Sequence, residues 1–370
     1  MKGELKKILP TLVLCILFLC GCAPKDARTT IQFASWGSKS EIDILKPILS
    51  DFEKENPAIK VDFMHIPQNY FQKIHLLLAS NTAPDVVFVN NLYLPVYEKF
   101  LEAMPAQTGY YTQALEALSY DGKLYAIPRD VSNLVVFYNK DMFDKRNISY
   151  PSSDWTFNDF LKIAQKLTDD RTFGVSYEEE PLFYLPYLMS EGGGFLPDEI
   201  NKPESQKALN FYTDLRNKYH VAPKKVESAS ATMAQMFLQE RLGMYISGRW
   251  MVPKLREEAK FDWDIVQFPR GSKGSIVQLD ASGWAIAKSS KHKKEALQFI
   301  NYLASKESSE KFTKSGLIIP ARVDVSVNDG QKPQHSQVFL DIIKTSKPTP
   351  VTKNYNEIID KLKKDMELRY

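Results

Sequence analysis

Three cysteines carry all the thiol chemistry available to this chain, and they are Cys15, Cys20 and Cys22. No cysteine follows residue 22 in a sequence of 370 residues. The body of the protein therefore has no disulfide, no thiolate metal site and no cysteine nucleophile. Zinc-finger, iron–sulfur and thiol-protease classes are excluded together.

Other conventional catalytic motifs are missing too. The sequence contains no Gly-x-Ser-x-Gly, His-Glu-x-x-His, Walker or Gly-x-Gly-x-x-Gly pattern. Its histidines lack metal-ligand spacing, at positions 65, 75, 220, 292 and 335. The sequence does not exclude a glycosidase with a pair of catalytic carboxylates, because the two residues can lie anywhere along a chain. Nothing in the sequence requires an enzyme or a cofactor.

The clustered cysteines belong to an apolar leader. Three lysines in the first seven residues precede Ile8–Cys20, a run of 13 mostly apolar residues. The run is too short to cross about 30 Å of hydrocarbon as a helix, but it fits the apolar core of a secretory signal. The Leu-Cys-Gly-Cys sequence ending at Cys22 resembles the lipobox of bacterial lipoproteins, whose cysteine is diacylated. The alternative is an ordinary cleaved signal. The resemblance implies a signal peptide over 1–21, a tether over 22–28, lipidation of Cys22 and anchoring on the extracytoplasmic face of the cell membrane.

Length and composition indicate the class of protein that follows this leader. A chain of 370 residues exceeds the roughly 100–200 residues of one domain, so two lobes are expected. Hydrophobic residues make up 44% and charged residues 25%, which is close to an average soluble chain and excludes disordered, collagen-like and multi-span membrane classes. The net charge is +3, and the first seven residues supply +2 of it, so nucleic acid is a poor candidate partner.

From residue 29 onward, strand and helix patterns alternate. The sequence predicts strands over 30–36, 59–64 and 86–89, separated by a helical repeat from Ile42 to Phe52 and a helix over 70–79. That order indicates a parallel sheet covered on both faces. Further elements are predicted as strands at 134–138, 243–246 and 264–266 and helices at 157–167, 205–219 and 293–303.

Five sequence blocks, in order, resemble those of bacterial extracellular solute-binding proteins. These are the substrate receptors of ABC importers, in the cluster that includes maltose-binding protein. The similarity covers residues 30 to about 325, and five blocks in sequence are far more specific than one. The blocks are Ala-Pro-Asp-Val-Val at 83–87, Ser-Tyr-Asp-Gly-Lys-Leu-Tyr-Ala-Ile-Pro at 119–128 followed by Val-Phe-Tyr-Asn-Lys-Asp-Met-Phe at 136–143, the segment 237–250, Gly-Trp-Ala-Ile at 283–286 with 291–304, and 316–322.

The resemblance implies an α/β fold of two lobes, a type II-like periplasmic-binding-protein fold with the ligand cleft between the lobes. Lobe 1 would comprise 28–130 plus 281–325, and lobe 2 would comprise 131–280 plus 326–370. The lobes would close over the ligand by a hinge motion. Ligands in open α/β sheets lie beyond the carboxyl ends of strands, so the loops after those strands are expected to carry the pocket.

In lobe 1, the resemblance places ligand contacts in the loops after two strands. Trp36, Ser38 and Lys39 follow the first strand, and Asn90 and Asn91 follow the strand over 86–89. Amides suit sugar hydroxyls, because each amide can both donate and accept. The alternatives are a helix cap with a core tryptophan for the first loop, and a simple turn for the second.

The first crossing between the lobes carries Asp130 and Ser132, which fall where the cluster has pocket or hinge groups. Arg129 could instead pair with Asp130 as a structural ion pair. The second crossing carries Ser282, Gly283 and Trp284, where small residues would let the backbone reach the ligand.

Trp250 is the strongest single candidate, since the cluster has a sugar-stacking aromatic at this position. A planar indole offers an apolar surface to the C–H face of a pyranose. The alternative is a core tryptophan. Glu180 resembles the acidic residue of the maltose receptor's Glu-Pro-aromatic loop, although Leu182 replaces an aromatic there. Tyr355 could supply a further aromatic from the carboxyl-terminal region.

The sequence therefore predicts a monomeric, non-catalytic, lipid-anchored receptor that binds a mono- or oligosaccharide and delivers it to the permease subunits of an ABC importer. The first alternative is a non-sugar solute bound by the same fold. An anion such as glycerol phosphate would need Arg129, Arg249 or Lys39 in the cleft. A polyamine or thiamine-like cation would need a cage of carboxylates and aromatic rings. A surface glycosidase or esterase, or an adhesive lipoprotein, are more distant alternatives.

Overall fold

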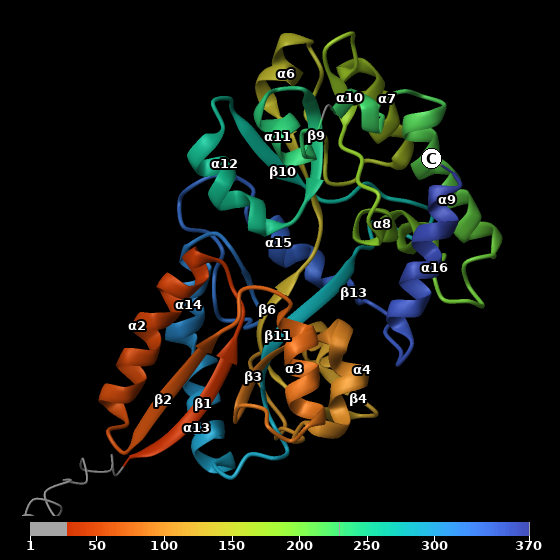
Figure 1. Ribbon diagram of the computed structural model, residues 1–370. Helices are drawn as coiled ribbons and strands as arrows, with labels where there is room; N and C mark the ends of the chain where they lie inside the picture. The colour runs from red at the N-terminus through yellow and green to blue at the C-terminus, as the bar shows by residue number, and fades with distance from the viewer. Residues whose placement is uncertain (1–27, 229, 370) are drawn as a thin grey trace, which may run out of the picture.

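The computed structural model describes residues 28–228 and 230–369. The apolar leader, the candidate lipidation residue Cys22 and most of the predicted tether lie outside the described residues. The described residues form two α/β lobes stacked end to end, as predicted (Figure 1). Among them, no helix is both long and apolar enough to span a bilayer.

The larger sheet forms the core of lobe 1. Its strand order is β12-β6-β11-β3-β1-β2, and β13 also pairs with β11. The strands are β1 (Thr29–Ser35), β2 (Ile59–His65), β3 (Val86–Asn90), β6 (Ile127–Ser132), β11 (Gln278–Ile286), β12 (Ile319–Pro320) and β13 (Lys347–Pro348). The predicted parallel arrangement is confirmed for β2, β1 and β3, whereas β11 runs antiparallel to β3 and β6.

Helices cover both faces of this sheet (Figure 1). On one side lie α2 (Lys39–Glu55), α13 (Lys293–Leu303) and α14 (Lys306–Lys314), which contact one another. On the other side lie α3 (Tyr70–Ala79) and α4 (Leu94–Tyr97). The first four residues of β3 are fully buried, as expected for a strand with two covered faces. The remaining elements of this part are α5 (Thr112–Ala117), β4 (Ser119–Tyr120) and β5 (Lys123–Leu124).

The smaller sheet forms the core of lobe 2, in the order β10-β7-β9-β8. Its strands are β7 (Val135–Asn139), β8 (Phe173–Val175), β9 (Leu242–Ser247) and β10 (Trp263–Val266). The helices around it are α6 (Lys140–Lys145), α7 (Phe157–Leu167), α8 (Pro181–Glu191), α9 (Pro203–Asn217), α10 (Lys225–Ser228), α11 (Met233–Leu238), α12 (Val252–Glu258), α15 (Val338–Asp341) and α16 (Tyr355–Glu367). Trp263 lies in the core of this lobe.

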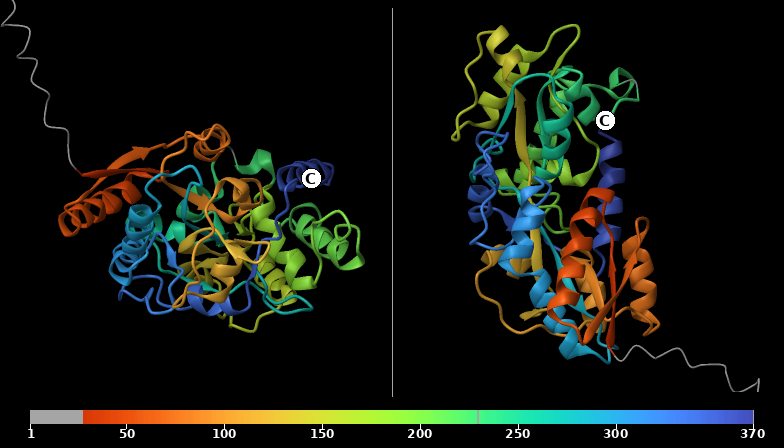
Figure 2. Two further views of the ribbon diagram at one scale, coloured as in Figure 1. Left: turned by 90° about the horizontal axis from the view of Figure 1, so that it is seen from below. Right: turned by 90° about the vertical axis from the view of Figure 1, so that its left-hand side faces the viewer.

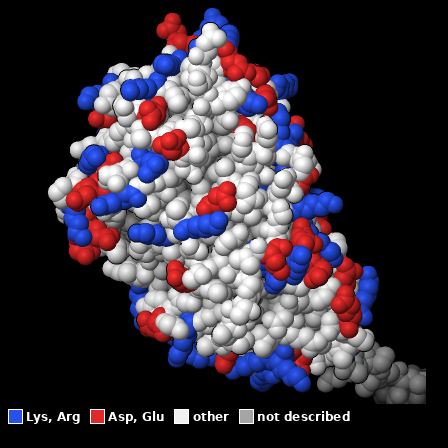
Figure 3. Space-filling view, turned by 180° about the vertical axis from the view of Figure 1, so that it is seen from behind, with Lys and Arg blue, Asp and Glu red and all other residues white. Residues whose placement is uncertain are grey.

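The chain passes between the two sheets twice, because it leaves the larger sheet between β6 and β7 and returns between β10 and β11. After β12 it leaves the larger sheet again, and β13 then pairs with the start of β11 before α16 packs against α8. Strand pairing in the larger sheet extends past the predicted lobe boundaries, because β6 continues to Ser132 and β11 begins at Gln278. The side view in Figure 2 shows the resulting elongated outline, with the lobe of the larger sheet at the lower end. On the face seen in Figure 3, acidic and basic side chains are interspersed, with broad uncharged areas between them.

Candidate functional site

A cavity of about 280 Å³ lies between the lobes, and we call it the cleft cavity. Lobe 1 supplies the loop after β1, the first turn of α2, the carboxyl-terminal parts of β3 and β6, the middle of β11, and the turn that leads into β12. Lobe 2 supplies the turn after β9. The lining residues are Trp36, Glu41, Asn90, Arg129, Asp130, Val131, Ser132, Arg249, Trp250, Ser282, Leu317, Ile318 and Ile319. Six residues predicted from the sequence therefore come together here: Trp36, Asn90, Asp130, Ser132, Trp250 and Ser282.

Two tryptophans face this cavity from opposite lobes. Trp36 directly follows β1 and remains 40% exposed, although Phe71 and Phe88 support its ring at centroid distances of 6.5 and 6.4 Å. Trp250 remains 37% exposed. A Cβ on Gly248 would lie 1.9 Å from the ring of Trp250, so the indole rests directly on the backbone of this glycine. Both rings are thus held in place while part of each surface stays available.

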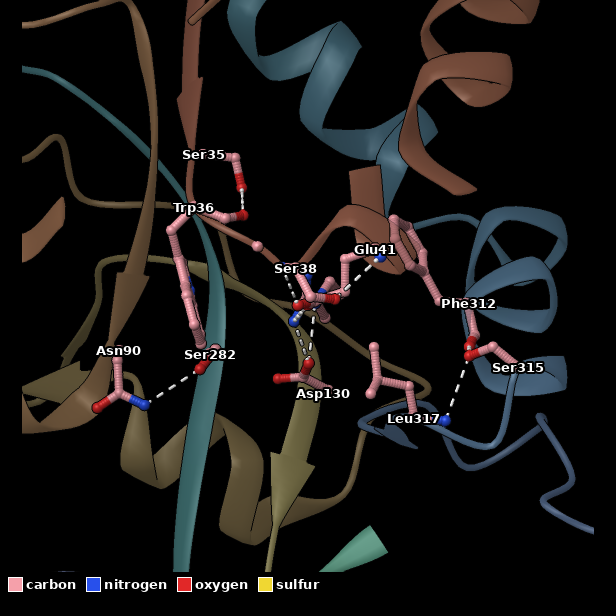
Figure 4. Close-up of polar contacts among 12 residues, drawn as sticks. Ser35, Trp36, Ser38, Glu41, Asn90, Asp130, Ser282, Phe312, Ser315 and Leu317 are labelled. Carbon is pink, nitrogen blue, oxygen red and sulfur yellow. Dashed lines mark hydrogen bonds and ion pairs between the residues drawn. The ribbon is translucent and has the colours of Figure 1, made fainter. Parts of the chain in front are cut away.

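Strand register brings three of the polar residues together. Ser282 in β11 is the partner of Asn90 in β3 on one side and of Asp130 in β6 on the other. The Asn90 Nδ2 donates to the Ser282 Oγ at 3.1 Å (Figure 4), and the Asn90 Oδ1 accepts from the backbone of Leu92 at 2.9 Å. These residues lie up to 192 positions apart in the sequence, yet they form one row across the cleft edge of the sheet.

A buried ion cluster forms the adjacent part of the wall. The guanidinium of Arg129 donates from Nε and Nη2 to Asp130 Oδ2 at 2.8 and 2.5 Å, and from Nη2 to Glu41 Oε1 at 3.4 Å. It also lies over the ring of Phe88, 4.6 Å from its centroid. Burial raises the pKa of Asp130, although the charge of Arg129 and its hydrogen bonds act in the opposite direction. Arg129 and Asp130 therefore form the ion pair that was the alternative to a pocket role, and Asp130 also lines the cavity.

Glu41 was not predicted as a site residue, although the local sequence contains its signal. Ser-Lys-Ser-Glu at 38–41 is a capping box, in which Ser38 Oγ accepts from the Glu41 backbone and Glu41 Oε2 accepts from the Ser38 backbone at 3.0 Å. The box begins α2 and leaves Glu41 Oε1 free to accept from Arg129 Nη2. Ser38 itself does not line the cleft cavity, because its hydroxyl caps the helix.

Arg249 has guanidinium nitrogens that lack hydrogen-bond partners among the described residues. Its Nη2 donates to the carbonyls of Thr313 and Val327 at 3.3 and 3.4 Å, whereas Nε and Nη1 are buried with no hydrogen-bond partner among the described residues. Burial lowers the pKa of Arg249 to about 10. Only 1% of the residue is exposed, so it does not offer an open cationic surface to a ligand.

Seven predicted residues do not line the cavity, namely Ser38, described above, and Lys39, Asn91, Gly283, Trp284, Glu180 and Tyr355. Lys39 is exposed and pairs with Asp43 at 2.6 Å. Asn91 is fully buried, where its Nδ2 donates to Asp280 Oδ1 at 3.1 Å and its Oδ1 accepts from the Ala281 backbone at 3.0 Å, which ties the turn after β3 to β11.

The second-crossing prediction needs correction at two positions. A Cβ on Gly283 would lie 2.2 Å from the Ile127 carbonyl, so this glycine permits close approach of β11 to β6 rather than of backbone to ligand. Trp284 is 1% exposed and packs against Phe312, inside the core of lobe 1. Its side chain cannot contact a ligand in this conformation.

Glu180 and Tyr355 also lie outside the cleft cavity. Glu180 precedes α8 and pairs with Lys363 of α16 at 2.7 Å. Tyr355 begins α16 and packs edge-to-face against Phe195 at 6.2 Å. Burial raises the pKa of Tyr355, and the nearby Asp280 and Tyr93 raise it further.

The charged groups of the cavity bear on three alternatives from the sequence, a glycosidase, a cation receptor and an esterase. Its two carboxylates, Glu41 and Asp130, lie on one wall and share Arg129, so they do not flank a substrate bond from opposite sides. Arg129 also engages both carboxylates, so neither is free to pair with a cationic ligand. No histidine is among the described residues that line the cavity, so it contains no serine–histidine pair.

Comparison with known proteins gives three findings. The family model described as bacterial extracellular solute-binding protein matches residues 48–336. The chain is 23% identical to the galactooligosaccharide-binding protein of Bacillus subtilis over 92% of this chain and 86% of the relative, and 23% identical to the maltodextrin-binding protein MdxE of the same species over 83% and 78%. Its structure resembles an ABC substrate-binding protein from Listeria monocytogenes solved in complex with cycloalternan, with a TM-score of 0.82 and 26% identity over 92% and 93% of the two chains.

Proposed function

The chain belongs to the bacterial extracellular solute-binding proteins, and from this premise we propose that it is the receptor of an ABC importer that binds a carbohydrate in the cleft cavity. The proposed ligand contacts are Trp36, Asn90, Asp130, Ser132, Trp250 and Ser282. The receptor acts as a monomer, without catalysis, and delivers the sugar to the permease subunits.

One observation carries the proposal: two part-exposed indole rings on opposite lobes face a single cavity with a polar, charge-balanced wall. A pyranose has apolar C–H faces and hydroxyls around its edge. Indoles suit the faces, while the amide and hydroxyl groups of Asn90, Ser132 and Ser282 suit the edge. The names of the relatives, which bind galactooligosaccharides and maltodextrins, support the same class of ligand.

Hinge closure follows from the placement of the rings. A sugar that touches Trp36 on lobe 1 and Trp250 on lobe 2 gains both contacts only when the lobes are close together. Binding therefore favours the closed form, and the permease can distinguish this form from the open one. We place the lobe division at 28–130 plus 281–325 and 131–280 plus 326–370, with β6 and β11 carrying the hinge.

Membrane anchoring is proposed from the sequence of the leader alone. Diacylation of Cys22 after removal of residues 1–21 would hold the receptor on the extracytoplasmic face of the membrane. Mass spectrometry of the amino-terminal peptide checks this proposal, which predicts an acylated residue 22 and its loss in Cys22→Ser.

A thermal-shift screen tests the ligand class. The chain from residue 23 onward is heated with monosaccharides, oligosaccharides, sugar phosphates, polyamines and amino acids, because a ligand of the native state raises Tm. We expect an oligosaccharide to raise Tm by several degrees, and Trp250→Ala to abolish the shift. Tyr150→Ala is the matched control, since Tyr150 is 41% exposed and lies outside the cavity. A shift from a phosphate or amine alone would contradict the carbohydrate assignment.

A further inference from the structure

The carboxyl end of β1 is paired unequally on its two sides. On one side, β1 pairs with β2 over all seven of its residues. On the other side, it pairs with β3 at only two positions, the last of which joins Ala34 to Val87, although β3 continues to Asn90. The pairing of β1 with β3 therefore ends short of Trp36 and Asn90, the two residues that line the cleft cavity from these strand ends.

The side chain of Tyr70 lies where this pairing ends. Its hydroxyl donates to the Ala34 carbonyl of β1 at 3.0 Å and accepts from the Phe88 amide of β3 at 2.8 Å. In the parallel register that pairs Ala34 with Val87, the amide of the following residue, Phe88, faces the Ala34 carbonyl. The hydroxyl thus lies between two backbone groups that could otherwise bond to each other.

The turn into α3 places Tyr70 against the sheet. Tyr70 is the first residue of α3, and Asn69 before it has a φ of 52°, in the left-handed region that asparagine tolerates better than most residues. Tyr70 is only 4% exposed. Burial raises the pKa of Tyr70 well above its usual value, so the hydroxyl stays protonated and can donate and accept at the same time.

The gap between β1 and β3 is also the point where the strand order reverses direction. β2 lies on one side of β1 and β3 on the other, and the helices α2 and α3 that connect these strands lie on opposite faces of the sheet (Figure 1). Connections that leave neighbouring carboxyl ends in this way create a crevice, which is where ligands of open α/β sheets bind. A hydroxyl inserted between β1 and β3 is therefore placed to set the width of this crevice.

Tyr70 also contacts both of the rings that support Trp36. Its ring lies 5.3 Å from that of Phe71 and 6.5 Å from that of Phe88, edge-on in both pairs. The indole of Trp36 packs against the same two rings at 6.5 and 6.4 Å. In Figure 4 this indole extends toward Ser282 in the cavity wall. The end of β1 and the support of the indole therefore both depend on Tyr70.

We propose that Tyr70 is a positioning residue for the ligand, whose hydroxyl holds β1 and β3 apart and so sets where Trp36 meets a sugar ring. This inference rests on the proposed function and adds to it a residue that does not line the cleft cavity. Without the hydroxyl, the Phe88 amide can donate directly to the Ala34 carbonyl, and the pairing of the two strands extends. Trp36 is then drawn over Phe88, where it is less exposed and misplaced for stacking.

Acrylamide quenching of tryptophan emission tests the position of Trp36 without any ligand. The measurement uses Trp250→Phe protein, in which the three other tryptophans are at most 3% exposed. Tyr70→Phe in this background should lower the quenching of Trp36. Tyr212→Phe is the matched control and should leave the quenching unchanged. Tyr212 is 1% exposed, and its hydroxyl also bonds to a backbone amide and carbonyl, those of Glu178 in lobe 2.

Titration calorimetry with maltotriose and galactotriose connects this position to binding. In protein that keeps both cleft tryptophans, Tyr70→Phe should weaken binding of the preferred sugar about tenfold, and Tyr212→Phe should change it by less than about twofold. In a Trp36→Ala background, Tyr70→Phe should cause no further loss, because Tyr70 acts through that ring. A purely structural role would instead give the same loss in both backgrounds.

The outcomes separate this inference from the proposed function. Unchanged quenching in Tyr70→Phe, or an equal loss of affinity with and without Trp36, would overturn the inference alone. Failure of Tyr70→Phe to fold where Tyr212→Phe folds would overturn it too, because the two strands would then be unable to pair without the hydroxyl. Failure of the wild type to bind these trisaccharides and every other sugar of the thermal-shift screen would instead contradict the proposed function, whatever the quenching shows.

Discussion

The two walls of the cleft cavity differ in how their charged groups are held. On lobe 1, Arg129 is bonded to both Glu41 and Asp130, and Asn90 is bonded to Ser282. On lobe 2, Arg249 is equally buried, yet it bonds only to two backbone carbonyls and has unpartnered nitrogens among the described residues. The comparison shows that the lobe 1 wall is preorganised by side-chain hydrogen bonds, so under the proposed function lobe 1 would bind the sugar first and lobe 2 would add Trp250 on closure.

The largest expected loss of stability comes from removing Arg129, which holds the ion cluster of the lobe 1 wall. Arg129→Met leaves two buried carboxylates without their cation, and removing one partner of a buried ion pair costs about 3–5 kcal/mol. Denaturant unfolding at pH 7 measures the loss in the free energy of unfolding. The triple variant Arg129→Met, Glu41→Gln, Asp130→Asn should recover much of it, because no charge of this cluster then remains buried. A loss below about 1 kcal/mol in the single variant would show that the cluster does not hold this wall.

The neighbouring residues Asn90 and Asn91 separate a ligand-binding role from a structural role within the same wall. Asn90→Ala removes a cavity-facing amide and should weaken sugar binding about tenfold, while Asn91→Ala leaves buried partners unsatisfied and should cost about 1–3 kcal/mol of stability. Calorimetric titration and denaturant unfolding of both variants separate the two effects. The assignment is contradicted if Asn91→Ala weakens binding more than Asn90→Ala in protein that remains folded.

Lobe 2 also contains a carboxyl group whose environment differs from that of Asp130. Burial, together with the nearby charges of Glu180 and Glu179, raises the pKa of Glu178 from 4.5 to about 7. The native state therefore holds a proton that the unfolded chain releases, and the free energy of unfolding should fall as pH rises from about 4.5 to 7. Glu178→Gln should lack this fall and gain about 1–2 kcal/mol on wild type between pH 5 and pH 8, a value reduced for partial exposure. Equal pH dependence of unfolding in the two proteins would contradict the shifted pKa.

The smallest effect is expected at the less satisfied arginine. Arg249→Met removes a buried charge that has no carboxylate bonded to it, so the free energy of unfolding should change by no more than about 1 kcal/mol. Comparing its unfolding curve with that of Arg129→Met measures the asymmetry directly. Similar losses in the two variants would mean that the walls are equivalent.

Much of the fold follows from local sequence patterns. The helix predicted over 157–167 has the same bounds as α7, because Thr156 and Asp159 form a capping box that determines where it begins. The apolar stretch 86–89 is a buried strand flanked by helices, as its composition indicates. The direction of β11 was not predictable in this way, since its antiparallel pairing depends on β3 and β6, which lie far away in the sequence.

The sequence predicted the site residues that lie at the ends of strands. It did not predict how deep in the sheet a residue such as Trp284 would lie. Trp36 and Asn90 each lie at or just past the end of a strand and do reach the cavity. Ser282 and Trp284 are two residues apart on one strand, but β11 rises about 3.3 Å per residue, so the tryptophan lies deeper and is covered by α14. Asn91 differs from Asn90 because its amide is used by Asp280 and Ala281, a tertiary contact with no local signal.

The most direct test of the central claim uses the tryptophans themselves. Trp36 and Trp250 are 40% and 37% exposed in the cleft cavity, whereas Trp155, Trp263 and Trp284 are at most 3% exposed. Titrating an oligosaccharide that raises Tm while recording tryptophan emission should give a saturable change. The change should be reduced in Trp36→Phe and in Trp250→Phe, and absent in the double variant. A saturable change that persists in the double variant, or sugar binding with no change in the emission of wild type, would contradict a carbohydrate site between these two rings.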